Sequence, residues 1–229
     1  MIKLDRTSVM NMDNAIRGAR NPMNSWDRMD SGYKTWEEGA KEVYPEILKS
    51  ENESEKYYCL GEKDLGLAIR LRKAGSDHRK YLRQVFVSVD VIAPLYWWKE
   101  YDTYKVATVA NSCSTMHKIS AKEFTREDFS CDKLSDEGLK DLDNLIERLE
   151  IYRKRYLNED DLVIKKQHWW DMIQLLPTSY NQMRTCSLNY ETLINIYNAR
   201  KNHKLDEWHV FCDWIKTLPY AKELILCEE

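Results

Sequence analysis

The sequence predicts an α+β protein, a single domain in which several helices pack on a small, mainly antiparallel sheet. Apolar residues recur at helical spacing along the chain, whereas one segment, Gln84 to Ile92, alternates as a strand does. The 229 residues, 43% of them hydrophobic, are enough for one sizeable core. The chain has only seven glycines and five prolines, which indicates a dense helical protein.

The first 60 residues are interpreted as an N-terminal extension of unassigned role, packed on a main domain of residues 61–229. A short helix is expected to begin at Asp13 to Arg17. A second helix is expected from Thr35 to Lys49, because Thr35 can cap it and acidic residues follow in its first turn. Pro45 interrupts this second helix.

Three consecutive elements are predicted in the middle of the chain. Glu62 to Lys73 is an amphipathic helix that Gly75 closes, as a glycine C-cap commonly does. Pro94 can start a further helix, Leu95 to Tyr104, at its first turn. Between these helices lies the strand Gln84 to Ile92, in which one face carries Val85, Val87, Val89 and Val91.

The second half of the chain is predicted to be mostly helical. A loop from Phe124 to Leu134 precedes a long helix from Ser135 to Leu157. Shorter helices are expected at His168–Leu176, Asn189–Arg200, Leu205–Thr217 and Tyr220–Leu226.

Composition and charge exclude several classes of partner. The net charge of −3 and the pI near 6.0 argue against a nucleic-acid partner. No apolar run is long enough to cross a bilayer, and Met1 to Arg6 lacks the apolar core of a signal peptide. Six scattered cysteines without a C-x-x-C pair argue against zinc and indicate reduced thiols. We therefore expect a cytoplasmic protein with no membrane partner.

The segment from Asn189 to Arg200 combines an apolar stripe with a polar edge. A spacing of about eleven residues is roughly three helical turns, so Asn189 and Arg200 would lie almost on one line. Such an edge suits an anionic or amide-rich ligand. The helix dipole alone also favours a cation such as Arg200 at a C-terminus. Asn195 has poor helix propensity, and either a ligand or a packing partner explains it.

Two other polar residues have a similar pair of explanations. His78 precedes the predicted strand, where it is either an imidazole beside a ligand or part of a turn that Ser76 or Asp77 caps. Ser114 lies in a stretch rich in serine and threonine, where it is either a ligand contact or a cap.

Two neighbouring segments, Pro94 to Lys105 and Asn111 to His117, resemble the signature of the flavin-dependent thymidylate synthases. In that family a strand leads to a proline and a helix that ends in Arg-His-Arg, and a spacer then brings Asn-Glu-x-Ser-x-Arg-Tyr. Asn111 and Ser114 match this pattern, and Thr103-Tyr104-Lys105 stands in place of Arg-His-Arg. The family's glutamate, arginine and tyrosine are replaced by Ser112, Met116 and His117.

The C-terminal part resembles the same family more closely. The retained residues, which follow Leu176-Pro177 and Thr185-Cys186 at the family's spacing, are Asn189, Asn195 and Arg200. Glu191 replaces an arginine of the family. The resemblance extends from about Ser76 to the C-terminus.

The resemblance implies a thymidylate synthase complementing protein-like fold and a homotetramer, since the family's sites lie between subunits. It implies reductive methylation of dUMP or a related pyrimidine nucleotide, with FAD as cofactor and with folate and NADPH as co-substrates. The residues that it assigns to the cofactor are Asn195, Asn189, Lys105, His78 and Tyr104. The residues that it assigns to the nucleotide are Ser114, Asn111 and Arg200. Arg200 and Ser114 would be catalytic, and Arg200 would stabilise negative charge that develops on the uracil ring.

The replaced cations favour an alternative function. A catalytically altered or inactive homologue would keep the fold and bind a nucleotide or a protein partner without flavin. Each lost charge-assisted hydrogen bond is worth about 1.5–3 kcal/mol, so several losses abolish tight binding unless other cations compensate. The cations that offer compensation are Lys99, Lys105, Arg79 and Arg83.

Overall fold

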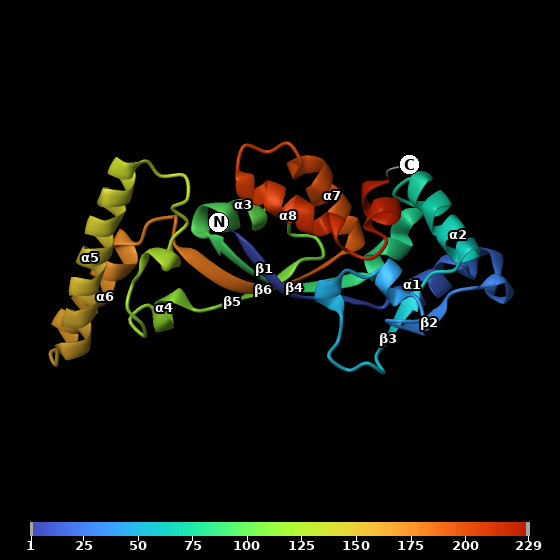
Figure 1. Cartoon of the computed structure of the whole chain (residues 1–229). Coiled ribbons are helices and arrows are strands. Elements are labelled where there is room, and N and C mark those ends of the chain that lie inside the picture. The colour runs from blue at the N-terminus through green and yellow to red at the C-terminus, as the bar shows by residue number, and fades with distance from the viewer. Residues whose placement is uncertain (1, 228–229) are drawn as a thin grey trace. The chain divides into compact units, whose positions relative to one another are not determined.

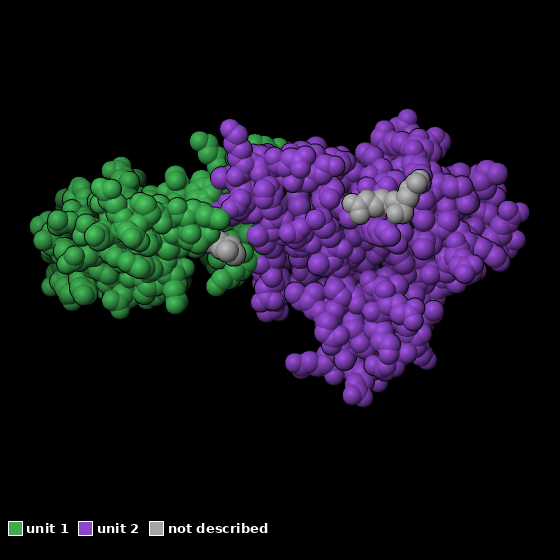
Figure 2. Space-filling model, turned by 45° about the horizontal axis from the view of Figure 1, so that its top comes forward, with its two compact units in different colours: residues 1–3, 91–103, 111–185 green, residues 4–90, 104–110, 186–229 purple. Residues whose placement is uncertain are grey.

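The computed structural model describes residues 2–227 and divides the chain into two compact units. Unit 1 comprises the start of the chain with residues 91–103 and 111–185. Unit 2 comprises residues 4–90, 104–110 and the chain from residue 186 onward. Figure 2 colours the two units separately. The chain passes between them within β1, β4, β5 and β6 and in the loop after α3, so each unit is built from segments far apart in the sequence.

The main sheet has four strands in the order β1-β4-β6-β5 (Figure 1), and a two-stranded sheet pairs β2 with β3. The strand bounds are Lys3–Met10 (β1), Gly32–Thr35 (β2), Lys56–Cys59 (β3), Phe86–Pro94 (β4), Val109–Ser112 (β5) and Asn181–Asn189 (β6). β4 and β6 run antiparallel: Tyr190 N–H donates to the Val85 carbonyl (3.1 Å) beyond one end of the pair. Beyond the other end, Leu95 N–H donates to the Tyr180 carbonyl (3.0 Å).

In unit 1 the helices α5 and α6 pack against each other, as Figure 1 shows. The helix bounds are Leu95–Tyr101 (α3), Thr115–Lys118 (α4), Arg126–Asp128 (the 3₁₀ turn η6), Asp136–Asn158 (α5) and Leu162–Leu175 (α6). Ser135 caps α5, because its Oγ accepts from Gly138 N–H (3.2 Å). The core of this unit consists of Ile119, Phe124, Phe129, Leu142, Leu149 and Met172.

Unit 2 contains the remaining helices. The α-helices are Met12–Ala19 (α1), Glu62–Lys73 (α2), Tyr190–Arg200 (α7) and Asp206–Lys216 (α8), and the π-helix η7 spans Lys222–Leu226. Short 3₁₀ turns lie at Asn21–Met23 (η1), Trp26–Arg28 (η2), Ala40–Glu42 (η3), Glu46–Leu48 (η4) and Arg79–Gln84 (η5). α7 packs against η5, α8 and η7, which buries most of its length. No helix of the described residues is both long and apolar enough to span a membrane.

A buried ion pair ties the N-terminal segment to α2 within unit 2. The Asp64 side chain is fully buried, and its Oδ1 accepts from Arg20 Nε at 2.6 Å. Its Oδ2 accepts from the backbone N–H groups of Asp30 (3.1 Å) and Ser31 (3.0 Å) and from the Ser31 hydroxyl (2.5 Å). Burial alone would raise the pKa of Asp64, but these hydrogen bonds, led by that of Ser31, outweigh burial and lower the pKa.

The predicted α+β class and most predicted elements of the main domain are confirmed. α2 has the predicted bounds, and Gly75 follows it with φ +105°, in the left-handed region that glycine tolerates. The valines of β4 are fully buried, as the alternation predicts.

The helix predicted from Thr35 to Lys49 is wrong. Thr35 ends β2, and the chain then forms only the 3₁₀ turns η3 and η4. Gly39 adopts φ +128°, which no α-helix contains, and Pro45 is extended with ψ 152°. Trp36, Ala40 and Tyr44 nevertheless face inward, in a cluster with Cys59 of β3, whereas Ile47 is exposed.

Candidate functional site

Arg200, the last residue of α7, is a predicted site residue that contacts two aromatic side chains in unit 2. Its Nε donates a hydrogen bond to the Tyr104 hydroxyl at 2.8 Å. Its guanidinium carbon lies 4.7 Å from the ring centroid of Trp208, which is within the range of a cation–π contact. Arg200 is partly exposed, whereas Trp208 on α8 is fully buried. The structure therefore brings together Arg200 and Tyr104, two residues assigned separately to nucleotide and cofactor.

The segment that carries Tyr104 and Lys105 returns to unit 2 between α3 and β5. Thr192 on α7 holds it, because the Thr192 hydroxyl donates to the Val106 carbonyl (3.3 Å). Ala107 has φ +57°, an uncommon backbone conformation for a residue with a side chain. Lys105 is exposed. One charged and one aromatic side chain of the predicted cofactor set thus lie on a short segment pinned to α7.

The two predicted asparagines have different environments on α7. Asn189 precedes the helix as its N-cap, in an extended conformation with φ −128°. Its Oδ1 accepts from Thr192 N–H (2.9 Å), and the residue is only 4% exposed. Asn195 lies within α7 and is exposed. The amide of Asn189 is thus engaged in starting the helix, while that of Asn195 faces solvent.

Glu191, which stands where the family has an arginine, binds two arginines of η5. Its Oε1 lies 3.2 Å from Arg79 Nε, and its Oε2 lies 2.6 Å from Arg83 Nε. The Glu191 side chain is 11% exposed, and the hydrogen bond from Arg83 raises the pKa of that guanidinium. Two of the cations that offered compensation at an anion site are therefore paired with one carboxylate.

His78 lies at the start of η5 and lines a pocket of about 640 Å³. Lys80 and Arg83 line the same pocket, together with apolar groups such as Pro22 and Leu71. His78, Lys80 and Pro22 are exposed. Asp77 adds one carboxylate to the lining. The pocket thus places two cationic side chains and one carboxylate beside apolar surface, an arrangement that offers an anionic group of a partly apolar ligand two cationic partners.

Ser114 and Asn111 lie in unit 1. The Ser114 hydroxyl caps α4 by accepting from His117 N–H (3.3 Å). Asn111 lies in β5 and is exposed. Gln182 on β6 holds the neighbouring turn, because its Nε2 donates to the Cys113 carbonyl (3.0 Å). The structure shows the cap at Ser114, and the nucleotide roles of both residues stay predictions.

Sequence reasoning missed Arg184, an ordered arginine of β6 in unit 1. Its guanidinium lies 4.2 Å from the ring centroid of Trp98. Its Nη1 donates to Asp102 Oδ1 (2.8 Å) and its Nε to Gln182 Oε1 (3.0 Å). The sequence offers only a weak signal for this residue, a lone arginine in a polar segment.

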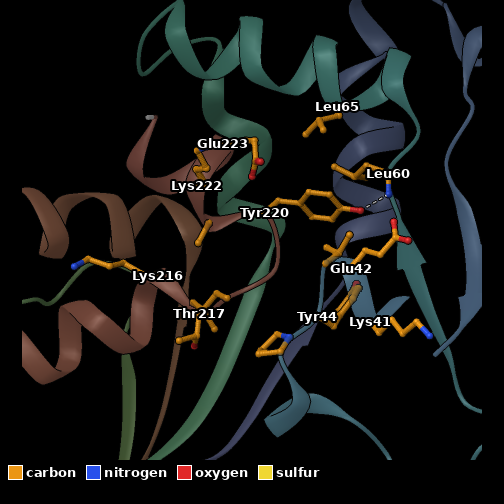
Figure 3. Close-up of a pocket in the computed structure, with 14 residues that line it drawn as sticks. Lys41, Glu42, Tyr44, Leu60, Leu65, Lys216, Thr217, Tyr220, Lys222 and Glu223 are labelled. Atoms are coloured by element: carbon orange, nitrogen blue, oxygen red, sulfur yellow. Dashed lines mark hydrogen bonds between the residues drawn. The ribbon is translucent and has the colours of Figure 1, made fainter. Parts of the chain in front are cut away.

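A further pocket, of about 620 Å³, lies in unit 2 and is drawn in Figure 3. Tyr220 extends across it, and its hydroxyl accepts from Leu60 N–H at 2.6 Å. Three lysines line the pocket, and two of them, Lys41 and Lys216, have ion-pair partners of their own. The predicted site residues are not part of this lining. No cluster of three or more metal-binding side chains occurs in the part of the chain that the structure describes.

No family model and no curated protein matches this sequence. Solved structures do match over almost the whole chain. Thymidylate synthase X from Helicobacter pylori, crystallised with FAD and dUMP, superposes with a TM-score of 0.64 at 15% identity. The match covers 98% of this chain and 97% of that chain. The UMP/dUMP methylase PolB from Streptomyces cacaoi, bound with 5-Br dUMP, has a TM-score of 0.58 at 13% identity, over 99% and 95% of the two chains.

These matches show the fold. The chain has the fold of the flavin-dependent thymidylate synthases, and the predicted resemblance to that family is confirmed at this level. Because the match covers 98% of this chain, it includes most of the first 60 residues, which the motif resemblance does not reach.

Proposed function

We propose that this protein binds a pyrimidine nucleotide at Arg200 and catalyses its flavin-dependent reductive methylation, with dUMP or a related nucleotide as substrate. The observation that carries the proposal is the guanidinium of Arg200, held by Tyr104 and Trp208 in a chain with this fold. The assignment of Arg200 to the nucleotide comes from the motif resemblance. The two matched proteins were crystallised with dUMP or its 5-bromo analogue, which supports a pyrimidine ligand.

Arg200 would act on the pyrimidine ring itself. A guanidinium donates hydrogen bonds in a fixed plane, which suits the carbonyl oxygens at the edge of a uracil. Negative charge that develops on the ring during one-carbon transfer would be stabilised by this fixed positive charge. Ser114 and Asn111 are proposed to contact the nucleotide as well, on the strength of the motif alone.

The fit to FAD rests on the pocket beside η5. His78, Lys80 and Arg83 would hold the phosphates, and the apolar lining would cover a ring. Asn195 and Lys105, both exposed, and the less exposed Asn189 and Tyr104 complete the proposed cofactor set. When bound, the reduced flavin supplies the hydride, NADPH re-reduces it and a folate supplies the carbon unit. A homotetramer is proposed on the same resemblance, and its mass in solution is measurable by light scattering.

The second candidate function is a nucleotide-binding protein that takes no flavin. The specific observation that favours it is Glu191, which replaces an arginine and neutralises part of the charge of Arg79 and Arg83. A carboxylate at this position repels the phosphates of a dinucleotide and competes for the cations that would bind them.

Two measurements on the purified protein separate these functions. Absorbance at about 450 nm, in the isoalloxazine band, supports the flavoenzyme. A colourless protein that takes up no FAD on incubation refutes the flavin part. Such a protein supports the second candidate if it still binds dUMP in calorimetry.

Arg200→Ala tests the nucleotide site, with Lys201→Ala as the matched control one residue further along. The loss of one charge-assisted hydrogen bond, worth about 1.5–3 kcal/mol, is expected to weaken dUMP binding roughly 10- to 150-fold in Arg200→Ala. The Lys201 variant is expected to bind as wild type does, because Lys201 is exposed and contacts the ring of Tyr197. Equal dUMP affinity in Arg200→Ala and wild type would remove Arg200 from the site.

A further inference from the structure

The guanidinium of Arg200 is held by two aromatic side chains from distant parts of the sequence. Trp208 is fully buried and packs edge-on against Phe211, with ring centroids 5.8 Å apart. The Trp208 ring is therefore a rigid platform, and it lies 4.7 Å from the Arg200 guanidinium carbon. Stacking on an indole limits rotation of the guanidinium out of its plane.

Tyr104 supplies the contact within the guanidinium plane. Its hydroxyl accepts the Nε–H of Arg200 at 2.8 Å, an ordinary length for a hydrogen bond to a charged donor. Tyr104 is itself fixed, because the Thr108 hydroxyl donates to the Tyr104 carbonyl and Thr192 holds the next turn of chain through Val106. The indole of Trp208 fixes the plane of the guanidinium, and the hydrogen bond from Nε to Tyr104 fixes its rotation within that plane.

We propose that Tyr104 is a positioning residue that sets the orientation in which Arg200 meets its ligand. The inference rests on the proposed pyrimidine-binding function and gives Tyr104 a task other than contact with the cofactor. An arginine side chain loses much rotamer freedom when it binds, and a clamp that orders it beforehand reduces that loss. The ligand class that suits this geometry is planar, with an in-plane oxygen such as a ring carbonyl of a pyrimidine.

Histidine occupies the equivalent position in the family motif, and a phenol differs from it in a useful way. The Tyr104 hydroxyl oxygen accepts the hydrogen bond that Arg200 Nε donates. A protonated imidazole in the same place would repel Arg200. With tyrosine at this position, the side chain can hydrogen-bond to Arg200, the arginine proposed to bind the nucleotide.

Tyr104→Phe tests the proposal, because it removes one hydroxyl and keeps the ring. Tyr197→Phe is the matched control: it removes a tyrosine hydroxyl from α7 itself, on a residue whose ring contacts Lys201. Two readouts are taken on each full-length variant. The first is the exchange rate of the Arg200 Nε–H with water by ¹H–¹⁵N NMR, with the signal assigned from its absence in Arg200→Lys. The second is the dissociation constant for dUMP by calorimetry.

The expected result is at least about tenfold faster Nε–H exchange and about tenfold weaker dUMP binding in Tyr104→Phe, with both quantities unchanged in Tyr197→Phe. Unchanged Nε–H exchange in Tyr104→Phe would overturn the proposal, and so would faster exchange with unchanged dUMP affinity. A wild-type protein that binds no dUMP refutes the proposed function instead. In that case the Nε–H exchange alone decides whether Tyr104 orients Arg200.

Discussion

Replacing Asp64 by asparagine is expected to destabilise the protein by about 3–5 kcal/mol, because it leaves the Arg20 guanidinium buried without its counter-charge. The side chains of Asp64 and Arg20 are 0% and 5% exposed, so water does not replace the lost partner. The carboxylate accepts four hydrogen bonds, from Arg20 Nε, the Ser31 hydroxyl and the N–H groups of Asp30 and Ser31. An asparagine amide offers one acceptor atom in place of two and turns a donor toward one side of this network.

The assay is equilibrium unfolding in urea, followed by the fluorescence of the tryptophans. In thermal unfolding of a chain of this length, each kcal/mol of lost unfolding free energy lowers the melting temperature by about 2–4 °C. The expected loss therefore lowers the melting temperature by about 6–20 °C. Glu37→Gln is the control, because it breaks the exposed pair with Lys41 and is expected to change stability little. A loss below about 1 kcal/mol in Asp64→Asn would refute the reasoning that the buried pair anchors the N-terminal segment.

The pH dependence gives an independent check on Asp64. Hydrogen bonds lower the pKa of Asp64 in the folded protein below its unfolded value of about 3.9. The stability that follows from this shift is fully present above the unfolded pKa and is lost as the pH falls through the folded pKa. The difference in unfolding free energy between wild type and Asp64→Asn should therefore narrow below about pH 4. A difference that stays constant down to acid pH would show that the shift contributes nothing.

Two further substitutions test other parts of unit 2. Glu191→Gln is expected to strengthen FAD binding several-fold, because it frees Arg79 and Arg83 from a carboxylate. FAD binding is measured by the quenching of flavin fluorescence. Weaker or equal binding would count against an anion site beside η5. Gly61→Ala is expected to lower the unfolding free energy by about 1–3 kcal/mol, because its Cβ would lie 2.4 Å from the Asp30 carbonyl oxygen. An alanine variant as stable as wild type would show that the chain around Asp30 can shift.

Local sequence patterns predicted the elements that carry their own signals. α2 has both an amphipathic stripe and a terminating glycine, and β4 has valine at three alternate positions. β1 and β6 were missed because each exposes many polar residues and neither has a continuous apolar face. The stretch from Thr35 to Lys49 has helical spacing, but Gly39 and Pro45 prevent the helix. Tertiary packing still buries Trp36, Ala40 and Tyr44.

The motif named candidate site residues, but the sequence did not indicate their contacts. The motif singled out Arg200 and Tyr104, but nothing local indicates a hydrogen bond across 96 positions of the chain. Trp208 gave no signal at all, because a buried tryptophan on an amphipathic helix is ordinary core. The pairing of Glu191 with Arg79 and Arg83 likewise depends on the packing of η5 against α7, which only the folded chain reveals.

His78, Lys80 and Arg83, which line the pocket proposed for the FAD phosphates, lie in or beside η5, whereas Arg200 ends α7. A substitution at one of these places can therefore change the FAD and dUMP affinities by different amounts. Arg200 keeps its motif position and gains a tyrosine and a tryptophan as supports. Thr103-Tyr104-Lys105 stands where the resembled family has Arg-His-Arg, and Glu191 pairs with Arg79 and with Arg83, which lines the pocket proposed for FAD. A chain under selection for nucleotide binding alone would retain the first arrangement and tolerate the second. The ratio of dUMP affinity to FAD affinity is therefore the quantity that separates the flavoenzyme from the flavin-free nucleotide-binding protein.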